Sequence, residues 1–143
     1  MLYETAARLV NNHAVHSDWV VKNALIESFT VHARSLAIFL YPPEHARKRP
    51  DDVTSDDYVG DIQQWREARG AIPPELRTTI QRTGKEIAHL TTQRHPPGSP
   101  RKAWGPEPIV RAFFAPLKLF AAHVSAGRLD VSVSQFIAFL PAR

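Results

Sequence analysis

A long amphipathic stretch from Asp18 to about Leu40 constrains the fold most. Its apolar residues keep helical spacing at Val21, Leu25, Phe29, Leu36 and Phe39. Asp18 is a suitable N-cap, because its carboxylate can accept hydrogen bonds from the first free backbone N–H groups. Tyr41-Pro42-Pro43 ends the stretch, since a residue before proline is pushed out of helical geometry. The sequence therefore predicts one long helix around which the remaining segments pack.

Further helical patterns follow on both sides of this stretch, and no segment gives a firm strand pattern. We predict a compact all-α bundle of five to six helices that forms a single domain over residues 1–143. Proline-rich or polar loops are expected at about 42–55 and 95–108. The start of the last segment, Val-Ser-Val-Ser, alternates like a strand, which leaves its type open. The expected helices besides 18–40 are 2–15, 55–70, 74–95, 109–126 and 131–140.

Several residues are suited to begin or end these helices. Ser55 is expected to cap the helix that carries Val59, Ile62 and Trp65, and Gly70 to end it. Pro73-Pro74 should open the next helix, whose buried stripe is Leu76, Ile80, Ile87 and Leu90. Gly127 should end the helix 109–126, which Pro116 should kink, and Ser132 or Ser134 should cap the last one.

The segment 109–126 is apolar on more than one side, with Val110, Phe113, Phe114, Leu117 and Phe120. A helix that is apolar all round is either central in the core or covered by a partner. In a chain of 143 residues, we expect it to contribute to the interface of a homodimer.

The composition is that of an ordinary globular protein with a basic balance. Hydrophobic residues make up 43% and charged residues 22%, with a formal charge of +4. Of the 18 cations, 13 are arginines, which favours phosphate or carboxylate partners. There is no cysteine, which excludes disulfides, thiolate catalysis and cysteine zinc sites. No signal peptide or membrane span is apparent, so we expect a cytoplasmic protein without a membrane partner.

Arg82 and His89 are seven residues apart in a predicted helix. Seven residues are about two α-helical turns, so both side chains should project from nearly the same face. Arg82 is a permanently charged group that can bind phosphate, and His89 can donate or accept a proton. These two functions are the minimum for metal-independent RNA cleavage. An ordinary solvent-facing helix would show the same spacing, and this alternative stays open.

A polar patch interrupts the long helix at Glu27, His32 and Arg34. Unpaired charges are costly to bury, so these groups must pair, reach water or serve a site. They form either an internal Glu-His-Arg network or part of a phosphodiester site with His89 and Arg94. The second alternative requires the helices 18–40 and 74–95 to pack together.

Other polar clusters have simpler interpretations. Asp51, Asp52, Asp56 and Asp57 fit a solvated loop and a helix start better than a calcium site. His13 and His16 lack a third metal ligand nearby. The loop cations at 47–49 and 101–102 are expected to be solvated. No phosphate-binding loop, dinucleotide turn or nucleophile elbow is present. We therefore expect no cofactor and no bound metal.

Two patches, Asn23–Leu36 and Gly84–Thr91, resemble the HEPN superfamily, particularly its abortive-infection-like branch. The resemblance covers about two thirds of the chain, from Asp18 to Arg94 and loosely beyond. The family's hallmark is Arg, four to six residues, then His, usually with a polar residue after the Arg. Arg82 and His89 match it at the long limit with Thr83 in the polar place, and Gly84 is a departure.

The resemblance implies a helical bundle, dimerisation that joins two Arg/His pairs in one cleft, and metal-independent RNA cleavage. It assigns acid or base chemistry to His89 and phosphate binding to Arg82. Glu27, His32, Arg34 and Arg94 become supporting residues.

We expect such a ribonuclease in a defence or toxin–antitoxin setting, with RNA as substrate and an antitoxin-like protein as partner. The alternative is a non-catalytic helical module that binds protein or RNA and holds a buried Glu/His/Arg network. In the ribonuclease, His89 should lie exposed in a cleft. In the binding module, it should be buried with both ring nitrogens hydrogen-bonded.

Overall fold

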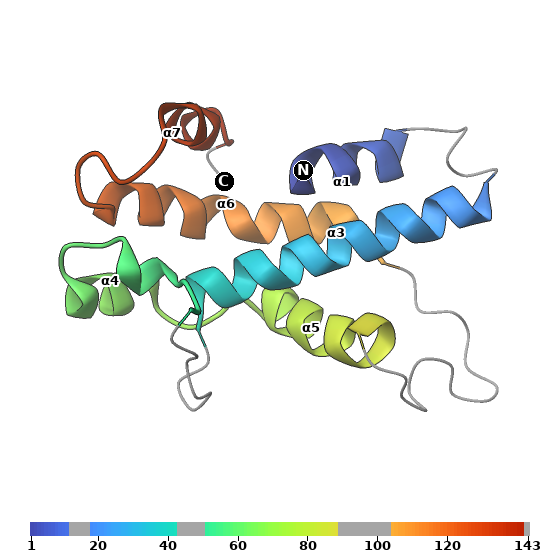
Figure 1. Ribbon diagram of the computed structural model, residues 1–143, viewed down its shortest axis with the longest axis horizontal. Coiled ribbons are helices and arrows are strands. Elements are labelled where there is room, and N and C mark those ends of the chain that lie inside the picture. The colour runs from blue at the N-terminus through green and yellow to red at the C-terminus, as the bar shows by residue number, and fades with distance from the viewer. Residues whose placement is uncertain (12–17, 43–50, 89–103, 142–143) are drawn as a thin grey trace.

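The computed structural model describes residues 1–11, 18–42, 51–88 and 104–141. Within these ranges it contains six α-helices and no strand, which confirms the predicted all-α bundle. A 3₁₀ turn (Ser55–Asp57) precedes α4, and a π-helical segment (Thr83–Ala88) continues α5. The helices, labelled as in Figure 1, are α1 (Leu2–Asn11), α3 (Trp19–Leu40), α4 (Ile62–Arg69), α5 (Pro74–Arg82), α6 (Pro106–His123) and α7 (Val131–Ala138).

Helix α3 matches the sequence prediction at both ends. The Asp18 side chain accepts hydrogen bonds from the backbone N–H groups of Val20 and Val21, at 2.9 and 3.2 Å. Tyr41 forms the C-cap, and its N–H donates to the Ala37 carbonyl. The prolines that follow therefore end the helix as predicted.

Helix α6 lies in the middle of the molecule and contacts the five other helices (Figure 1). It buries Ile109, Phe113, Pro116 and Phe120. Pro106 and Pro108 lie in its first turn rather than in a loop, so the loop predicted to reach 108 ends earlier. Proline is tolerated there because the first N–H groups of a helix have no intrahelical acceptor.

Three predicted helix ends are wrong. Asp61, not Ser55, caps α4 by accepting from the Gln64 N–H at 2.9 Å. Asp130, rather than Ser132 or Ser134, caps α7. Helix α6 ends at His123, and Gly127 lies beyond it in a turn with φ 76°. In the first two cases an acidic cap replaces a nearby serine, since several residues of suitable chemistry compete for one position.

Ser55 instead joins two helices through the carbonyl of Leu40, the last residue of α3. Its hydroxyl donates to that carbonyl at 3.3 Å and accepts from the Trp65 indole N–H at 3.1 Å. Arg69 donates a second bond to the same carbonyl at 2.6 Å. The free carbonyls at a helix C-terminus carry partial negative charge, so the guanidinium stabilises this end. We call Leu40, Ser55, Trp65 and Arg69 the α3–α4 junction.

The aromatic core continues from this junction into α6. Trp65 is fully buried and meets Phe120 edge-on, with ring centroids 5.7 Å apart. Phe39 also meets Phe120 edge-on at 5.3 Å. Edge-to-face pairs each contribute about 0.5–1.5 kcal/mol beyond burial. The end of α3, α4 and α6 therefore form one packed unit.

Replacing Ser55 with Ala should destabilise the fold by about 1–3 kcal/mol, because it leaves the buried Trp65 N–H without its acceptor. Urea unfolding of Ser55→Ala, Trp65→Phe and the double variant measures this. Trp65→Phe removes the donor as well, so the double variant should cost less than the sum of the two single variants. Additive costs would contradict the role of this hydrogen bond.

Candidate functional site

Two of the predicted site residues, His89 and Arg94, lie outside the described residues. The same is true of Leu90 of the predicted buried stripe, of His13 and His16, and of the loop cations at 47–49 and 101–102. Their assignments stay predictions.

Arg82 is held between a carboxylate and an indole ring. Its Nε and Nη2 atoms donate to the two Glu86 carboxylate oxygens, each at 2.9 Å. The guanidinium carbon lies 4.0 Å from the centre of the Trp104 ring. The side chain of Arg82 is 23% exposed and that of Glu86 12%. A bidentate pair of this kind is among the stronger charge-assisted interactions, so a phosphate at Arg82 would have to displace Glu86.

The backbone after Arg82 departs from α-helical geometry. Thr83–Ala88 form a π-helix, which has more residues per turn than an α-helix. The prediction that Arg82 and His89 share a face assumed α-helical periodicity, and that assumption does not hold for the intervening residues.

The helices that carry the two predicted patches do pack together. Thr83 donates a hydrogen bond to the Thr30 carbonyl of α3 at 3.4 Å, and both threonines are fully buried. Leu76 and Thr79 are the buried side chains of α5, whereas Ile80 and Ile87 of the predicted stripe are half-buried. The contact that the sequence argument required between helices 18–40 and 74–95 is therefore present.

The polar patch of α3 consists of Glu27, His32 and Arg34. These residues do not all lie on the side of α3 that contacts Thr83. His32 follows Thr30 by two residues, which is about 200° around the axis. It thus lies on the opposite side of α3 from the threonine contact. Glu27 is exposed and Arg34 half-buried. In the part of the chain that the structure describes, no ion pair or hydrogen bond joins Glu27, His32 and Arg34, and Arg34 Nε is buried without a hydrogen-bond partner.

The acidic cluster has structural partners. Asp57 accepts from the backbone N–H of Thr54 at 2.7 Å, and Asp56 pairs with Arg66 at 2.6 Å. Among residues 1–11, 18–42, 51–88 and 104–141, no three His, Asp or Glu side chains gather as a metal site would require. No helix in these ranges is long and apolar enough to cross a membrane.

A large concave surface lies elsewhere, along the face of α6 that points away from Phe113 and Phe120. We call it the α6 groove; its volume is about 1590 Å³. Helix α1 forms one wall with Tyr3, Ala6, Ala7 and Val10, and the end of α4 with the turn that follows forms another with Ala68, Ala71 and Pro73. The α6 residues that line it include Glu107, Val110, Arg111, Ala112, Phe114, Ala115, Pro116, Lys118, Leu119 and Ala122.

Three alanines of α6 line the α6 groove beside larger side chains. Ala112, Ala115 and Ala122 leave the backbone of α6 open to close approach. Glu107 and Arg111 are exposed and neutralise each other in an ion pair of 2.7 Å. Neither Arg82 nor Arg34 is among the residues that line the groove.

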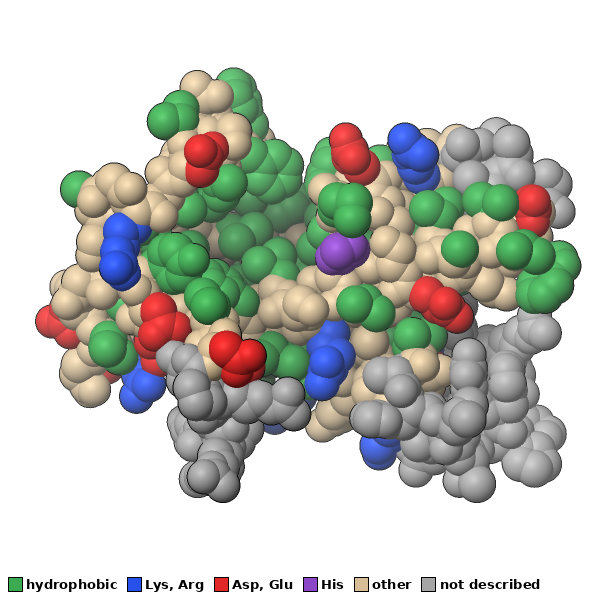
Figure 2. Space-filling view, in the orientation of Figure 1, with side chains coloured by type: hydrophobic (Ala, Val, Ile, Leu, Met, Phe, Trp, Pro, Cys, Tyr) green, Lys and Arg blue, Asp and Glu red, His purple; other side chains and the backbone are tan. Residues whose placement is uncertain are grey.

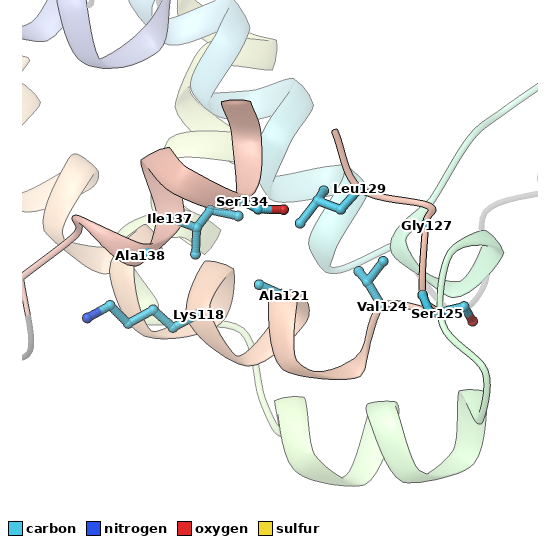
Figure 3. Close-up of a pocket in the computed structure, with 10 residues that line it drawn as sticks. Lys118, Ala121, Val124, Ser125, Gly127, Leu129, Ser134, Ile137 and Ala138 are labelled. Carbon is cyan, nitrogen blue, oxygen red and sulfur yellow. The ribbon is translucent and has the colours of Figure 1, made fainter. Parts of the chain in front are cut away.

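A smaller cavity of about 430 Å³ separates α7 from the end of α6 (Figure 3). Ile137, Leu129 and Val124 reach toward it, while the Lys118 side chain extends away (Figure 3).

Helix α7 exposes most of its apolar side chains. Phe139 is 87% exposed, and Phe136 and Val131 are also exposed. Phe136 meets Tyr3 of α1 edge-on, with ring centroids 6.1 Å apart. Figure 2 shows apolar side chains gathered on α7 and in the hollow between α7 and α1. Burying one exposed phenylalanine is favourable by about 1.5–3 kcal/mol, so such a surface favours association.

Tyr41 and Arg69 link the α6 groove to the α3–α4 junction. Both line the groove, and the Arg69 guanidinium carbon lies 5.1 Å from the Tyr41 ring centre. Burial raises the pKa of the Tyr41 hydroxyl above its usual value, and the Arg69 charge opposes that rise. The groove therefore keeps a neutral phenol beside a guanidinium.

The raised pKa of Tyr41 predicts a loss of stability at alkaline pH. Below the ordinary tyrosine pKa of about 10 the phenol is neutral in both states, so its contribution is fully present. As the pH rises further, the unfolded chain ionises first and stability falls. Tyr41→Phe should reduce this fall, measured by urea unfolding from pH 8 to 11. Equal slopes for Tyr41→Phe and the parent would contradict the assignment.

A comparison of the chain with protein-family models, curated proteins and solved structures finds no match in any of the three. The HEPN resemblance therefore stays a prediction.

Proposed function

We propose that the chain is a non-catalytic helical binding module whose α6 groove receives a short apolar helix of a protein partner. The observation that carries this proposal is the groove itself, lined largely by apolar side chains and bounded by two walls. Binding in such grooves is a common mode of helix recognition.

The size of the groove supports a polypeptide rather than a small molecule. Small-molecule sites usually enclose about 300–1,000 Å³, and this groove holds about 1590 Å³. A helix is about 10 Å wide and rises 1.5 Å per residue, so this volume accommodates about 13 residues. The fit is therefore to three or four helical turns.

The chemistry of the groove supports an apolar ligand. Alanine, valine, leucine, proline and aromatic side chains make up most of its lining, and its charged residues have both signs: Arg69, Arg111 and Lys118 against Glu75 and Glu107. Nucleic acid would favour a surface of uniformly positive charge. We therefore propose a protein partner rather than RNA for this surface.

Selection from a displayed library of 13-residue helical peptides tests the proposed function. Peptides enriched on the parent chain should carry an apolar stripe and should bind at least about tenfold more weakly to Ala115→Arg, whose side chain would fill the groove. Ala24→Arg is the matched control, because Ala24 is also an exposed alanine within a helix but lies on α3 outside the groove. If no enriched peptide distinguishes the two variants, the groove is not the binding site.

We propose metal-independent RNA cleavage as a second candidate function. It is favoured by the packing of the π-helical segment against α3, because π-helical segments occur frequently at functional sites. In this mechanism His89 transfers protons to and from the RNA. Arg82 binds a phosphate group of the RNA after its guanidinium has separated from the Glu86 carboxylate.

Cleavage of a mixed tRNA and mRNA pool in excess EDTA tests this candidate. His89→Ala and Arg82→Gln should both abolish cleavage while remaining folded by circular dichroism. Glu86→Gln should increase cleavage, since it removes the charge that competes with phosphate for Arg82. Cleavage that survives His89→Ala would contradict the assignment.

A further inference from the structure

We propose that the cavity between α6 and α7 binds the alkyl chain of a small aliphatic carboxylate, whose carboxylate group lies beside Lys118 at the rim. We call this space the α7 cavity. Among the described residues, Lys118 is the only one that lines both the α7 cavity and the α6 groove. The inference therefore concerns a second site and does not depend on the proposed function of the groove.

Alkyl side chains from three segments make up most of the lining of the α7 cavity. Val124 follows the last residue of α6, Leu129 belongs to the turn that leads to α7, and Ile137 belongs to α7 itself. All three reach toward the cavity in Figure 3, and Ala121 and Ala138 line it too. The interior therefore suits a hydrocarbon chain, which is driven into such a space by the loss of its contact with water.

The cavity offers few hydrogen-bonding side chains. Besides Lys118, the polar side chains in its lining are those of Ser125 and Ser134. The Ser134 hydroxyl already donates to the Asp130 carbonyl at 3.1 Å. A sugar or a nucleotide would lose the water around several polar groups without gaining partners for them, which is costly. The lining therefore selects a ligand that is mostly hydrocarbon.

Lys118 gives this apolar site a charge at one end. It has the one charged side chain among the ten described residues that line the cavity, and it extends away from Ala121 and Ile137 (Figure 3). None of the ion pairs among the described residues includes Lys118. A lysine stem covers apolar surface while the ammonium group stays in water. A carboxylate at the rim can thus pair with this ammonium and remain hydrated while its alkyl chain is buried.

The size of the cavity limits the length of the alkyl chain. A volume of about 430 Å³ lies near the lower end of the range for small-molecule sites. A water molecule takes up about 30 Å³ in the liquid. A methylene group is of similar size, so the cavity holds at most about fourteen such groups. Carboxylates of about six to ten carbons therefore fit, with room for solvent at the rim.

Nuclear magnetic resonance titration of the full chain with hexanoate, octanoate and decanoate tests the proposal. Saturable shifts of amide signals should centre on the segments that line the cavity, from Ala121 to Leu129 and from Ser134 to Ala138. Each added methylene should tighten binding by about fourfold, because one more CH₂ group leaves water. Shifts that do not saturate, or an affinity that is independent of chain length, would overturn the proposal.

Two variants test the location by filling the cavity from opposite sides. Ala121→Phe on α6 and Ala138→Phe on α7 should each weaken octanoate binding by at least about tenfold, because the new ring occupies the space of the alkyl chain. Ala24→Phe is the matched control, since Ala24 is an exposed alanine on α3 outside the cavity. Circular dichroism checks folding. Loss of binding in either folded variant supports the site, and unchanged binding in both rules it out.

Lys118→Met tests the carboxylate, because methionine keeps an unbranched apolar side chain and removes the charge. Octanoate should bind about two- to fivefold more weakly, as expected for an ion pair at a hydrated rim. The neutral 1-octanol should bind the variant and the parent equally well. Lys22→Met is the matched control, since Lys22 is also a half-buried lysine within a helix but lies on α3. An equal effect on both ligands, or no effect on octanoate, would contradict the role of Lys118.

The same variants distinguish this inference from the proposed function. Ala121 lines only the α7 cavity and Ala115 only the α6 groove. Ala121→Phe should therefore leave the selected helical peptides bound, and Ala115→Arg should leave octanoate bound. If Ala115→Arg abolishes octanoate binding and Ala121→Phe does not, the carboxylate binds in the groove and this inference is wrong. If no peptide binds while octanoate behaves as expected, the proposed function alone is wrong.

Discussion

The carbonyl of Leu40 is the point on which the arrangement of the helices depends. It terminates α3, and hydrogen bonds from Ser55 and Arg69 fix the following chain and α4 against that end. Because Trp65 donates to Ser55 and packs on Phe120, the same contact orients α6. The α6 groove is bounded by the turn that follows Arg69, so its shape depends on this junction.

Local signals in the sequence predicted much of the helical framework. Asp18, Tyr41, Gly70 and the pair Pro73-Pro74 mark helix ends through backbone chemistry that involves only nearby residues. Ser55 could not be assigned in this way. Its partners are Leu40 and Trp65, 15 and 10 residues away, and its serine chemistry suits a cap equally well. Long-range hydrogen bonds leave no periodic pattern.

The candidate site was predicted less well. The sequence indicated that the apolar helix 109–126 is either central in the core or covered by a partner. Helix α6 contacts the five other described α-helices, as the first alternative requires, and its outer face lines a groove. The groove itself was missed, because its walls come from α1 and the turn after α4, and only the recurrence of alanine hinted at it. Glu86, four residues after Arg82, was a signal that was available, since this spacing favours an ion pair on a helix. The π-helical turn that follows has no comparable sequence signature.

Pro116 lies in α6 between its core face and the groove, and it has a consequence for selectivity. Proline has no N–H, so the carbonyl of Ala112 receives no helical hydrogen bond from that position. Ala112 and Pro116 both line the groove, so the backbone acceptor that Pro116 leaves without this partner belongs to a residue of the groove lining. A uniformly apolar trough would let an apolar helix slide among registers of similar energy, whereas one directional acceptor favours the register that brings a donor to it. Pro116 thereby provides one fixed hydrogen-bonding position that can set the register of a bound helix.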